Sequence, residues 1–468
     1  MKRTPLLILC LTLFLDMLGF GFIMPLLPVY ITHYGGAPWV GGALMATFSL
    51  MQFVFAPIWG RRSDFTGRRP VILVGLGGSA VSYFFFGAAP NLAVLFLARA
   101  ASGILTAASL PTSQAYVADV TPPEKRSSGM AMLGASFGLG FAFGPLLGGV
   151  LGRYSLFGLP ALATPALVAA GLAVGNWFLA WRLLPESHTD RSVTQEKRSA
   201  LDAFPAIARA FRDPTVSRLL TVNVFITFAF TAVESSFSWL VILRLHPQMV
   251  VNAQQLWRGF ASMPTARIPA DIRALAPAHV DWALFTRSHF AALAPKLRND
   301  LIERAETAVT SRIFAIVGVA LLITQGFVMR GLAQRVGEHI LASFGVLVLT
   351  ITLIVLGYTG NLAVLYIASC AIAVGMGVLE PSMSAMITHA AGPKRRGQIS
   401  GTQRGLGSLA RMTAPPLNNW LVAVHTWIPF YASAALMGTG FILSLGIKPM
   451  SAIDAEGQAE SAGAQAAP

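Results

Sequence analysis

The segment Asn91-Leu-Ala-Val-Leu95 occurs a second time in the chain, as Asn361-Leu-Ala-Val-Leu365. The two copies lie 270 positions apart, from 91 to 361. The same shift relates further glycine, proline and arginine positions: Gly67 and Gly337, Gly75 and Gly345, Pro111 and Pro381, Pro123 and Pro393, Arg126 and Arg396, and Pro145 and Pro415. Self-similarity at one fixed shift indicates an internal duplication. The repeat therefore predicts two halves of similar structure.

The composition indicates whether these halves lie in water or in a membrane. Of the 468 residues, 54% are hydrophobic and 12% are charged, whereas soluble domains have about 25% charged residues. A membrane-spanning helix needs about 20 mainly apolar residues. The chain is therefore expected to be an all-α membrane protein with twelve transmembrane helices, six in each half, at 5–31, 39–59, 70–88, 91–118, 128–151, 159–184, 218–243, 312–329, 339–358, 361–389, 398–424 and 427–446.

The spans and the polar segments between them divide the chain. We expect an N-terminal half at 1–184, a linker at 185–217, a C-terminal half at 218–450 and a disordered tail at 451–468. The polar stretch 244–312 separates the seventh and eighth spans and is expected to be an extracytoplasmic insert. Such a small unit would be marginal alone, so it is expected to rest on the bundle or to bind an unknown partner.

The basic residues give an orientation. The net charge is +14, which in a soluble protein would suggest a nucleic-acid partner. Here most short-loop Lys and Arg residues fall on one side: Lys2, Arg3, Arg61, Arg62, Arg68, Arg69, Lys125, Arg126, Arg330, Arg335, Lys394, Arg395 and Arg396. Because cytoplasmic loops are enriched in Lys and Arg, we expect an inner (plasma) membrane protein with both termini and the linker in the cytoplasm, in contact with the lipid bilayer and not with nucleic acid.

Enzyme chemistry has little support. The two cysteines, Cys10 and Cys370, each lie in an apolar run, so neither a disulfide framework nor a cysteine metal site is indicated. No pairing of nucleophile and base and no metal-ligand spacing stands out. We expect no enzyme activity, no metal and no cofactor.

A glycine-bounded charged turn follows the second span. The stretch Gly60-Arg-Arg-Ser-Asp64-Phe-Thr-Gly67-Arg68-Arg69-Pro70 combines an acid with paired bases. Glycine permits a sharp reversal, and Asp64 can accept hydrogen bonds from a helix N-terminus and from Arg68. On charge alone the same stretch is an ordinary positive loop of a membrane protein.

Two further spans have small-residue faces. The fourth span contains Arg99-x-x-x-Gly103, which places a guanidinium beside a close helix contact. The fifth span contains a denser series of helix-breaking and small residues: Gly140, Gly144, Pro145, Gly148 and Gly149. A packing seam with a proline kink is the simplest interpretation, and such a seam could itself seal a gate.

Together these motifs resemble the major facilitator superfamily over nearly the whole chain. The first span, Leu15-Asp16-x-x-Gly19 with Pro25 and Pro28, is similar to drug/proton antiporters, particularly tetracycline/proton antiporters. The resemblance implies the major facilitator fold, an antiporter motif in the fifth span, and a cytoplasmic gate or charge relay at Gly60, Asp64, Gly67, Arg68, Asp119 and Arg404. The sequence departs from the family pattern at Arg62, Phe65 and Ala131 and in the insert.

Ionisable residues inside spans mark sites of function, since burying a charge in the bilayer is costly. Six are present: Asp16, Arg99, Glu234, Glu380, Arg404 and Arg411. Resemblance implies that spans one, four, seven and ten line the cavity. Counting residues puts Asp16 and Arg99 at a similar depth, either as a structural ion pair or, as favoured here, as a proton-coupling carboxylate and its modulator. For Glu234 both interpretations stand, and for Glu380, Arg404 and Arg411 structural pairing is favoured.

The sequence thus predicts a proton-coupled transporter that exports a small amphiphilic, drug-like compound, tetracycline-like or multidrug, by alternating access. Proton coupling and the substrate cavity are expected at Asp16, Arg99, Glu234, Glu380 and Arg411. One alternative is a metabolite transporter of the same fold. Another is a non-transporting receptor or scaffold with a partner on 244–312.

Overall fold

The N-terminal half is a bundle of apolar helices. The computed structural model describes residues 3–121, 126–152, 161–187, 211–261, 295–390 and 392–446. The expected tail at 451–468, and most of the expected linker and insert, lie outside these residues. The helices of this half are α1 (Arg3–Ile23), η1 (Met24–Leu26), α2 (Leu27–His33), α3 (Pro38–Thr66), α4 (Arg68–Gly87), α5 (Leu92–Thr106), α6 (Ser109–Val120), α7 (Arg126–Leu151), η3 (Ala161–Ala163) and α8 (Thr164–Leu183).

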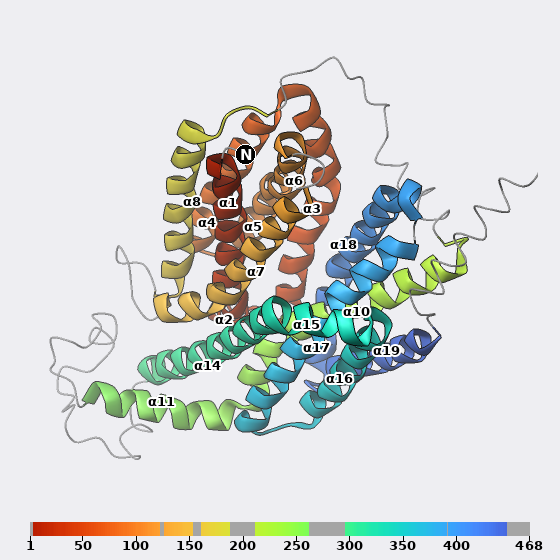
Figure 1. The fold of residues 1–468 in the computed structure, drawn as a ribbon. Helices are drawn as coiled ribbons and strands as arrows, with labels where there is room; N and C mark the ends of the chain where they lie inside the picture. The colour runs from red at the N-terminus through yellow and green to blue at the C-terminus, as the bar shows by residue number, and fades with distance from the viewer. Residues whose placement is uncertain are drawn as a thin grey trace, which may run out of the picture.

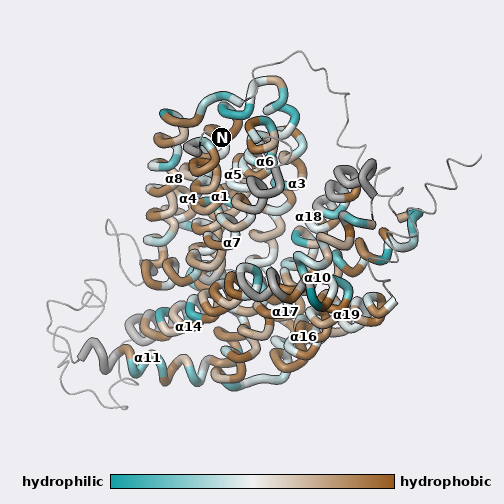
Figure 2. Tube along the Cα trace, viewed as in Figure 1, coloured by the Kyte–Doolittle hydropathy of each residue, from teal (hydrophilic) through white to brown (hydrophobic). Residues whose placement is uncertain are grey.

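The C-terminal half is also helical. Its elements are α10 (Pro214–Arg244), α11 (His246–Ala261), α14 (Pro295–Ile323), the π-helical turn η6 (Thr324–Val328), α15 (Met329–Val336), α16 (Glu338–Tyr358), α17 (Leu362–Ala390), α18 (Gly392–Val424) and α19 (Ile428–Leu445). In Figure 1 the N-terminal half stands upright and the C-terminal half lies across its lower end, with α14 passing beneath α7. Figure 2 shows hydrophobic residues along the helices and hydrophilic ones at the α3–α4 turn and on α11.

Equivalent residues of the repeat have equivalent structural roles. Gly67 and Gly337 have φ values of 100° and 86° and precede α4 and α16. A Cβ atom on Gly75 would lie 2.9 Å from Ser109 Oγ. A Cβ atom on Gly345 would lie 2.8 Å from Leu379 Cβ. Leu379 is the residue that the shift of 270 positions pairs with Ser109. The positive φ values explain the glycines before α4 and α16, and close helix contact explains the other pair.

Eleven helices within the described residues are long and apolar enough to cross a membrane. They extend over most of the expected spans, and the eighth covers Arg304–Gly326. Helix α18 has 33 residues but is more polar and is not among the eleven. Of the expected insert 244–312, α11 and the first turns of α14 are described and contact each other, while 262–294 lie outside the described residues.

The halves meet at one end of the bundle, here named the closed end. A Cβ atom on Gly42 of α3 would lie 2.3 Å from the carbonyl oxygen of Pro415 of α18, and one on Gly149 of α7 would lie 2.1 Å from Ser311 Cβ of α14. Trp239 of α10 is buried in the hydrophobic core of the opposite half. At the other end, here named the basic end, lies the α3–α4 turn, and α3 and α18 diverge toward it in Figure 1.

Candidate functional site

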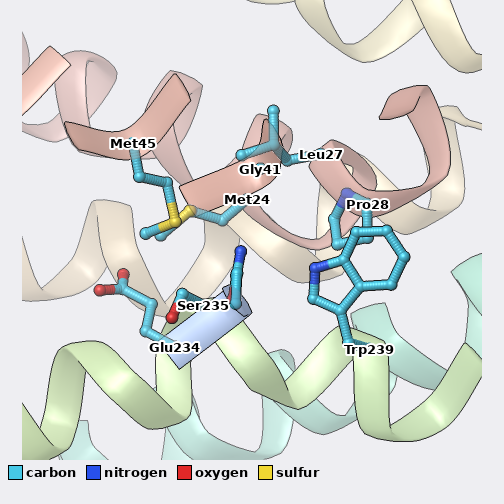
Figure 3. A pocket seen from close by; sticks show the side chains of 9 residues that line it. Met24, Leu27, Pro28, Gly41, Met45, Glu234, Ser235 and Trp239 are labelled. Atoms are coloured by element: carbon cyan, nitrogen blue, oxygen red, sulfur yellow. The ribbon is translucent and has the colours of Figure 1, made fainter. Parts of the chain in front are cut away.

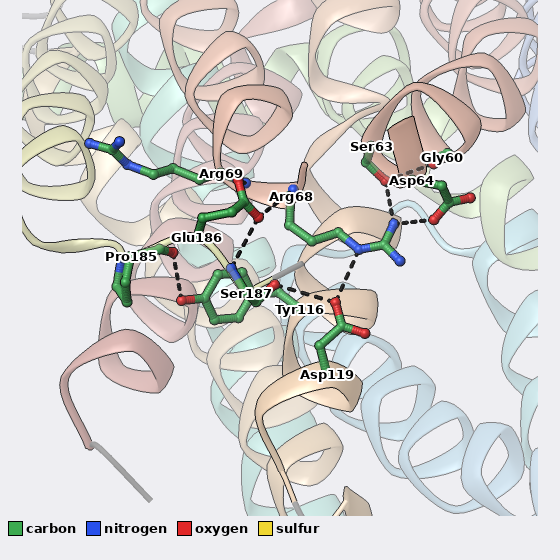
Figure 4. A network of polar contacts seen from close by, with 10 residues as sticks. All are labelled: Gly60, Ser63, Asp64, Arg68, Arg69, Tyr116, Asp119, Pro185, Glu186 and Ser187. Atoms are coloured by element: carbon green, nitrogen blue, oxygen red, sulfur yellow. Dashed lines mark hydrogen bonds and ion pairs between the residues drawn. The ribbon is translucent and has the colours of Figure 1, made fainter. Parts of the chain in front are cut away.

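Arg68, the first residue of α4, is the centre of a charged cluster at the basic end (Figure 4). Its guanidinium forms an ion pair with Asp64, donates to Ser63 Oγ at 2.6 Å, and donates through Nε to Asp119 Oδ2 at 3.2 Å. Ser63 in turn donates to the carbonyl of Gly60 at 2.6 Å. Arg68 is only 8% exposed, and the two carboxylates compensate its buried charge. The structure therefore brings together Asp64, Arg68 and Asp119 of the expected charge relay, with Gly60 and Gly67 beside them, while the side chain of Arg404 lies outside the described residues.

Glu186 is a member of this cluster that the sequence interpretation missed. Its carboxylate accepts hydrogen bonds from the backbone N–H groups of Arg68, at 2.8 Å, and Arg69, at 3.2 Å. These groups begin α4, where the helix has unpaired donors and favours a negative charge. A Cβ atom on Gly67 would lie 2.4 Å from Glu186 Oε2. Gly67 is therefore required by its positive φ and by the space that the carboxylate occupies.

The residues next to Glu186 also bind the N-terminal half. Ser187 Oγ donates to Asp119 Oδ2 at 3.3 Å, and Tyr116 donates to the carbonyl of Pro185 at 2.9 Å. The sequence interpretation assigned 185–217 to a linker. Its first residues, Pro185–Ser187, are attached to α4 and α6. Nothing in the local sequence specifies these contacts, because each partner lies 68 or more residues away.

Asp16 lies inside the N-terminal half. It is 8% exposed, accepts a hydrogen bond from Ser79 Oγ of α4 at 3.0 Å, and its backbone carbonyl accepts one from the Tyr83 hydroxyl at 3.1 Å. A Cβ atom on Gly19 would lie 2.5 Å from the Tyr83 ring. The glycine therefore admits the tyrosine that fixes α1 beside α4.

Among the described residues Arg99 forms no ion pair with Asp16, so the structural ion pair, which was the less favoured of the two interpretations, is absent from this structure. Its guanidinium lies over the rings of Phe48 and Phe86, 5.4 Å from each centroid, and is 3% exposed. An arginine over aromatic rings gains cation–π attraction.

Four of the six ionisable residues predicted inside spans belong to the C-terminal half. Arg411 of α18 is exposed, and its charge acts on both Glu234 of α10 and Glu380 of α17. It lies 3.4 Å from Ser408 Oγ, and no ion pair joins it to either carboxylate in the described part of the chain. The side chain of Arg404, the partner expected for Glu380, lies outside the described residues. Depth alone had placed Arg411 with Glu234, but these two side chains form no ion pair.

A small cavity of about 10 Å³ lies between the halves near the closed end (Figure 3). Buried Trp239 Nε1 and Asn419 Oδ1 have no hydrogen-bond partner among the described residues. Helices α2, α3, α10 and α18 and the turn η1 all contribute to its wall, which consists of Met24, Leu27, Pro28, Gly41, Met45, Glu234, Ser235, Trp239 and Asn419. Because both halves form this wall, their relative motion must change the cavity.

A second small cavity, of about 20 Å³, is more aromatic. Helices α7, α10, α14 and α17 enclose it with Phe141, Phe230, Val233, Glu234, Phe237, Ile313, Phe314, Val317 and Ile372. Glu234 lines both cavities and is the one ionisable residue of either wall. Sequence reasoning identified Glu234 as a cavity residue, but it could not find the phenylalanines around it, because they come from separate helices.

The glycine series of α7 mainly contacts α1. Cβ atoms on Gly140, Gly144 and Gly148 would lie 2.3 to 2.8 Å from backbone atoms of Phe14, Gly21 and Phe22. Gly149 faces α14 of the other half, and Pro145 lies within α7. The series therefore closes α7 onto α1 and continues to the junction at the closed end.

Comparisons with known proteins agree with this arrangement. A family model described as Major Facilitator Superfamily matches residues 9–265 and 283–467. The chain belongs to this superfamily. The tetracycline resistance protein, class C, of Escherichia coli is 29% identical over 435 residues, which cover 91% of this chain and 92% of that protein.

Solved structures of the superfamily have the same fold. The human organic anion transporter MFSD10 (TETRAN) aligns with a TM-score of 0.61 and 24% identity, over 94% of this chain and 99% of that one. A bacterial homologue of the human lysosomal transporter Spinster, in an inward-facing and unoccupied conformation, aligns with a TM-score of 0.63 and 14% identity, over 94% of both chains.

Membership in the Major Facilitator Superfamily identifies the chain as a multi-pass membrane transporter. Its relatives are transporters and not enzymes, which agrees with the expectation from the sequence. Within the part of the chain that the structure describes, no cluster of three or more His, Cys, Asp or Glu residues could hold a metal ion. The candidate site is therefore the pair of cavities between the halves, with buried Asp16 and the charged cluster at the basic end.

Proposed function

We propose that this chain is a proton-coupled exporter of small amphiphilic, drug-like compounds, tetracycline-like or multidrug in type, and that it works by alternating access. The observation that carries the proposal is the position of Glu234, a carboxylate on the wall of both cavities where the two halves meet. Transporters built from repeats bind substrate at the interface of the repeats near the bilayer midplane. The similarity to a tetracycline resistance protein supports a drug-like substrate.

The proposal includes a topology. The polar helix α18 is taken as a further span, which gives twelve, and residues 244–312 as an extracytoplasmic insert between the seventh and eighth spans. The protein is placed in the inner (plasma) membrane, with the basic end and both termini in the cytoplasm. The arginines at the basic end support this orientation: Arg61, Arg62, Arg68 and Arg69. The contact of Gly42 with Pro415 then closes the outer side, and the described state faces inward.

Asp16 is the proposed proton site. It is buried beside hydroxyl groups of Ser79 and Tyr83 and makes no ion pair with the described residues. A proton arriving from outside would neutralise this carboxylate. Because the neutral form costs less free energy to bury than the charged form, protonation would favour one arrangement of the halves over the other. The proton gradient is the energy source, and no other cofactor is invoked.

The cluster around Arg68 is the proposed cytoplasmic gate. Asp64 and Asp119 compensate its charge within the N-terminal half in the described state. In the outward-facing state, an approach of the α18 N-terminus would offer Asp64 a positive helix end, with Arg404 nearby in sequence. This exchange of partners would hold the cytoplasmic side closed.

A drug-susceptibility panel tests the proposed function. Cells that overexpress the chain should tolerate higher concentrations of tetracyclines or other amphiphiles, and inverted vesicles from them should accumulate the same compound when acidified inside. Unchanged susceptibility throughout the panel, with no pH-driven accumulation, would contradict it. Transport of an organic anion is the second candidate, since MFSD10 is described as an organic anion transporter and exposed Arg411 could meet an anion.

A further inference from the structure

The buried side of α6 consists mostly of hydroxyl-bearing side chains. Five residues of this helix are buried: Ser109, Thr112, Ser113, Tyr116 and Val117. Only Val117 among them lacks a hydroxyl group. The other four recur at intervals of three or four positions and so lie along one side of the helix, here named the hydroxyl face of α6. Within a membrane bundle, where no bulk water is present, each of these groups requires a hydrogen-bond partner.

Most of the hydroxyl face has no such partner in the protein. The Oγ atoms of Ser109 and Ser113 and the Oγ1 atom of Thr112 make no hydrogen bond with any described residue, and none of the three residues is more than 3% exposed. Serine and threonine in helices often donate to the carbonyl four residues earlier, as Thr12 does to Ile8. Since the three α6 hydroxyls do not, they are available to a ligand. Buried water commonly satisfies polar groups of this kind.

The inner end of the hydroxyl face lies at Asp16. Ser79 Oγ donates to the Asp16 carboxylate at 3.0 Å, and Ser109 Oγ faces the same carboxylate without completing a hydrogen bond to it. Asn176 of α8 donates to Thr12 Oγ1, one helical turn from Asp16, at 3.1 Å, while Asn176 Oδ1 has no partner among the described residues. The interior of the N-terminal half therefore holds several unused polar atoms close to its carboxylate.

The other end of the hydroxyl face reaches the charged cluster at the basic end (Figure 4). The Tyr116 hydroxyl donates to the carbonyl of Pro185 at 2.9 Å, and Ser187 Oγ donates to Asp119 Oδ2 at 3.3 Å. Asp119 lies three residues beyond Tyr116 on the same helix and is exposed. The hydroxyl face thus extends from the buried carboxylate of Asp16 to an acid at the surface.

The spacing of the hydroxyl face determines what would complete it. Residues three or four apart on a helix have Cβ atoms about 5–6 Å apart, whereas two hydroxyl oxygens form a hydrogen bond at about 2.7–2.8 Å. Successive hydroxyls on α6 are therefore too far apart to pass a proton directly. One water molecule between each pair would bond to both.

We propose that water bound along the hydroxyl face of α6 carries the proton from Asp16 to the basic end, inside the N-terminal half. This inference rests on the proposed function, in which Asp16 is the proton site, and specifies the route of proton release. The proton leaves the Asp16 carboxyl group for the nearest water or hydroxyl. Each member of the chain accepts one proton and gives up one, and one proton passes to solvent at Asp119. Proton and substrate then leave by separate routes, the substrate between the halves.

Few titratable side chains accompany this route. Those within the N-terminal half, on α6 and the described helices around it, are Cys10, Asp16, Tyr83, Arg99 and Tyr116. The guanidinium of Arg99 lies over two aromatic rings, and α7 and α8 contain no titratable residue between their ends. The others described on these helices and in the segment after α8 belong to the basic end: Arg61, Arg62, Asp64, Arg68, Arg69, Asp119, Arg182 and Glu186. Asp16 is therefore the one interior carboxylate from which this route can receive a proton.

Exchange of the Asp16 proton tests the route without requiring transport. Infrared spectra of purified full-length protein in nanodiscs are recorded at acid pH while H2O is replaced by D2O, and Asp16→Asn identifies the carboxyl band. Thr112→Val/Ser113→Ala removes two hydroxyls that bond to no described residue. It should slow the exchange about tenfold or more, as expected when one or two hydrogen bonds are lost from a proton path. Exchange at the wild-type rate would overturn the proposal, because the proton would then reach solvent another way.

Two control variants separate this role from a general effect on the bundle. Thr112→Ser keeps both hydroxyls of the turn and should exchange at the wild-type rate. Thr352→Val removes a buried hydroxyl of α16 that donates to the Val348 carbonyl at 2.7 Å, and it should also leave the rate unchanged. Slowing by Thr352→Val as large as that by Thr112→Val/Ser113→Ala would show a general effect and overturn the proposal.

Hydroxyl-radical labelling of the wild type decides the question if the double variant does not fold. Radicals that X-rays generate from bound water oxidise the side chains next to that water. Tyr116 is 0% exposed and Phe430 of α19 is 1% exposed, but only Tyr116 lies on the proposed route. Labelling of Tyr116 well above that of Phe430 supports the water chain, and equally low labelling of both overturns it.

The proposed function can fail separately. A protein that exports a compound in the susceptibility assay, but whose Asp16 proton exchanges equally fast in all variants, would keep its function and lose this route. A wild type without pH-driven transport, together with slow exchange in Thr112→Val/Ser113→Ala, would support the route and contradict proton-coupled export.

Discussion

Replacing Gly42 with alanine should weaken the closed end of the transporter. The new Cβ atom would lie 2.3 Å from the carbonyl oxygen of Pro415 and 2.6 Å from Pro416 Cα, and these backbone atoms cannot rotate away as a side chain can. Overpacking of this kind typically costs about 1–3 kcal/mol. Since 1.4 kcal/mol is a factor of ten, Gly42→Ala should shift the population away from the described state by about 5- to 150-fold.

Distance measurements between spin labels would detect this shift. With Cys10 and Cys370 replaced by serine, cysteines introduced at exposed Ala37 and His425 label the closed end on either half. Gly42→Ala should lengthen the mean distance between the labels. Gly171→Ala is the control, because its Cβ atom would meet nothing within 4 Å, and it should leave the distance unchanged. If both variants give the wild-type distribution, the close contact at Gly42 does not control the opening of this end.

Three further substitutions test other parts of the site. Asp16→Asn should fold normally and lose pH-driven accumulation in inverted vesicles, and accumulation at the wild-type level would remove Asp16 from the coupling role. Glu186→Ala should lower the free energy of unfolding by about 0.5–2 kcal/mol, as for other lost helix caps. Glu186→Gln should lower it less, and thermal unfolding measures both effects. Equal stability of the wild type and the two variants would contradict the capping role. Arg411→Ala should elute as a folded protein but transport poorly, because Arg411 is exposed yet acts on two carboxylates; aggregation would instead support the structural pairing expected from the sequence.

The sequence predicts the repeated architecture well, because the features that reveal it act locally. Gly67 and Gly337 are fixed by backbone conformation at a helix start, and the Asn91 side chain accepts from the Val94 backbone N–H while that of Asn361 accepts from Ala363. Such requirements depend on neighbours a few residues away. The ion pair of Arg68 with Asp64 was predictable for the same reason, since Asp64 lies four residues before Arg68.

Contacts between distant helices were not predictable in this way. Counting residues along spans gives the depth of Asp16 and Arg99 but not their lateral position, and the structure places the guanidinium between Phe48 and Phe86 instead. The α4 cap by Glu186 was missed because the carboxylate lies 118 residues from the backbone group it binds. The assembly of the phenylalanine cavity likewise depends on how α7, α10, α14 and α17 meet.

The attachment of Glu186 and Ser187 to α4 and α6 has a consequence for how the molecule could be divided. Since these contacts fix the chain as far as Ser187 to the N-terminal half, and the Asp213 side chain begins α10 by accepting from Thr215 and Val216, a break between the two would leave both helical units intact. Two fragments produced from separate messages should then recognise each other through the surfaces around Gly42 and Gly149 and rebuild a working transporter. The covalent link between the halves would in that case ensure that they are produced in equal numbers. The contact surfaces themselves would determine how the halves associate.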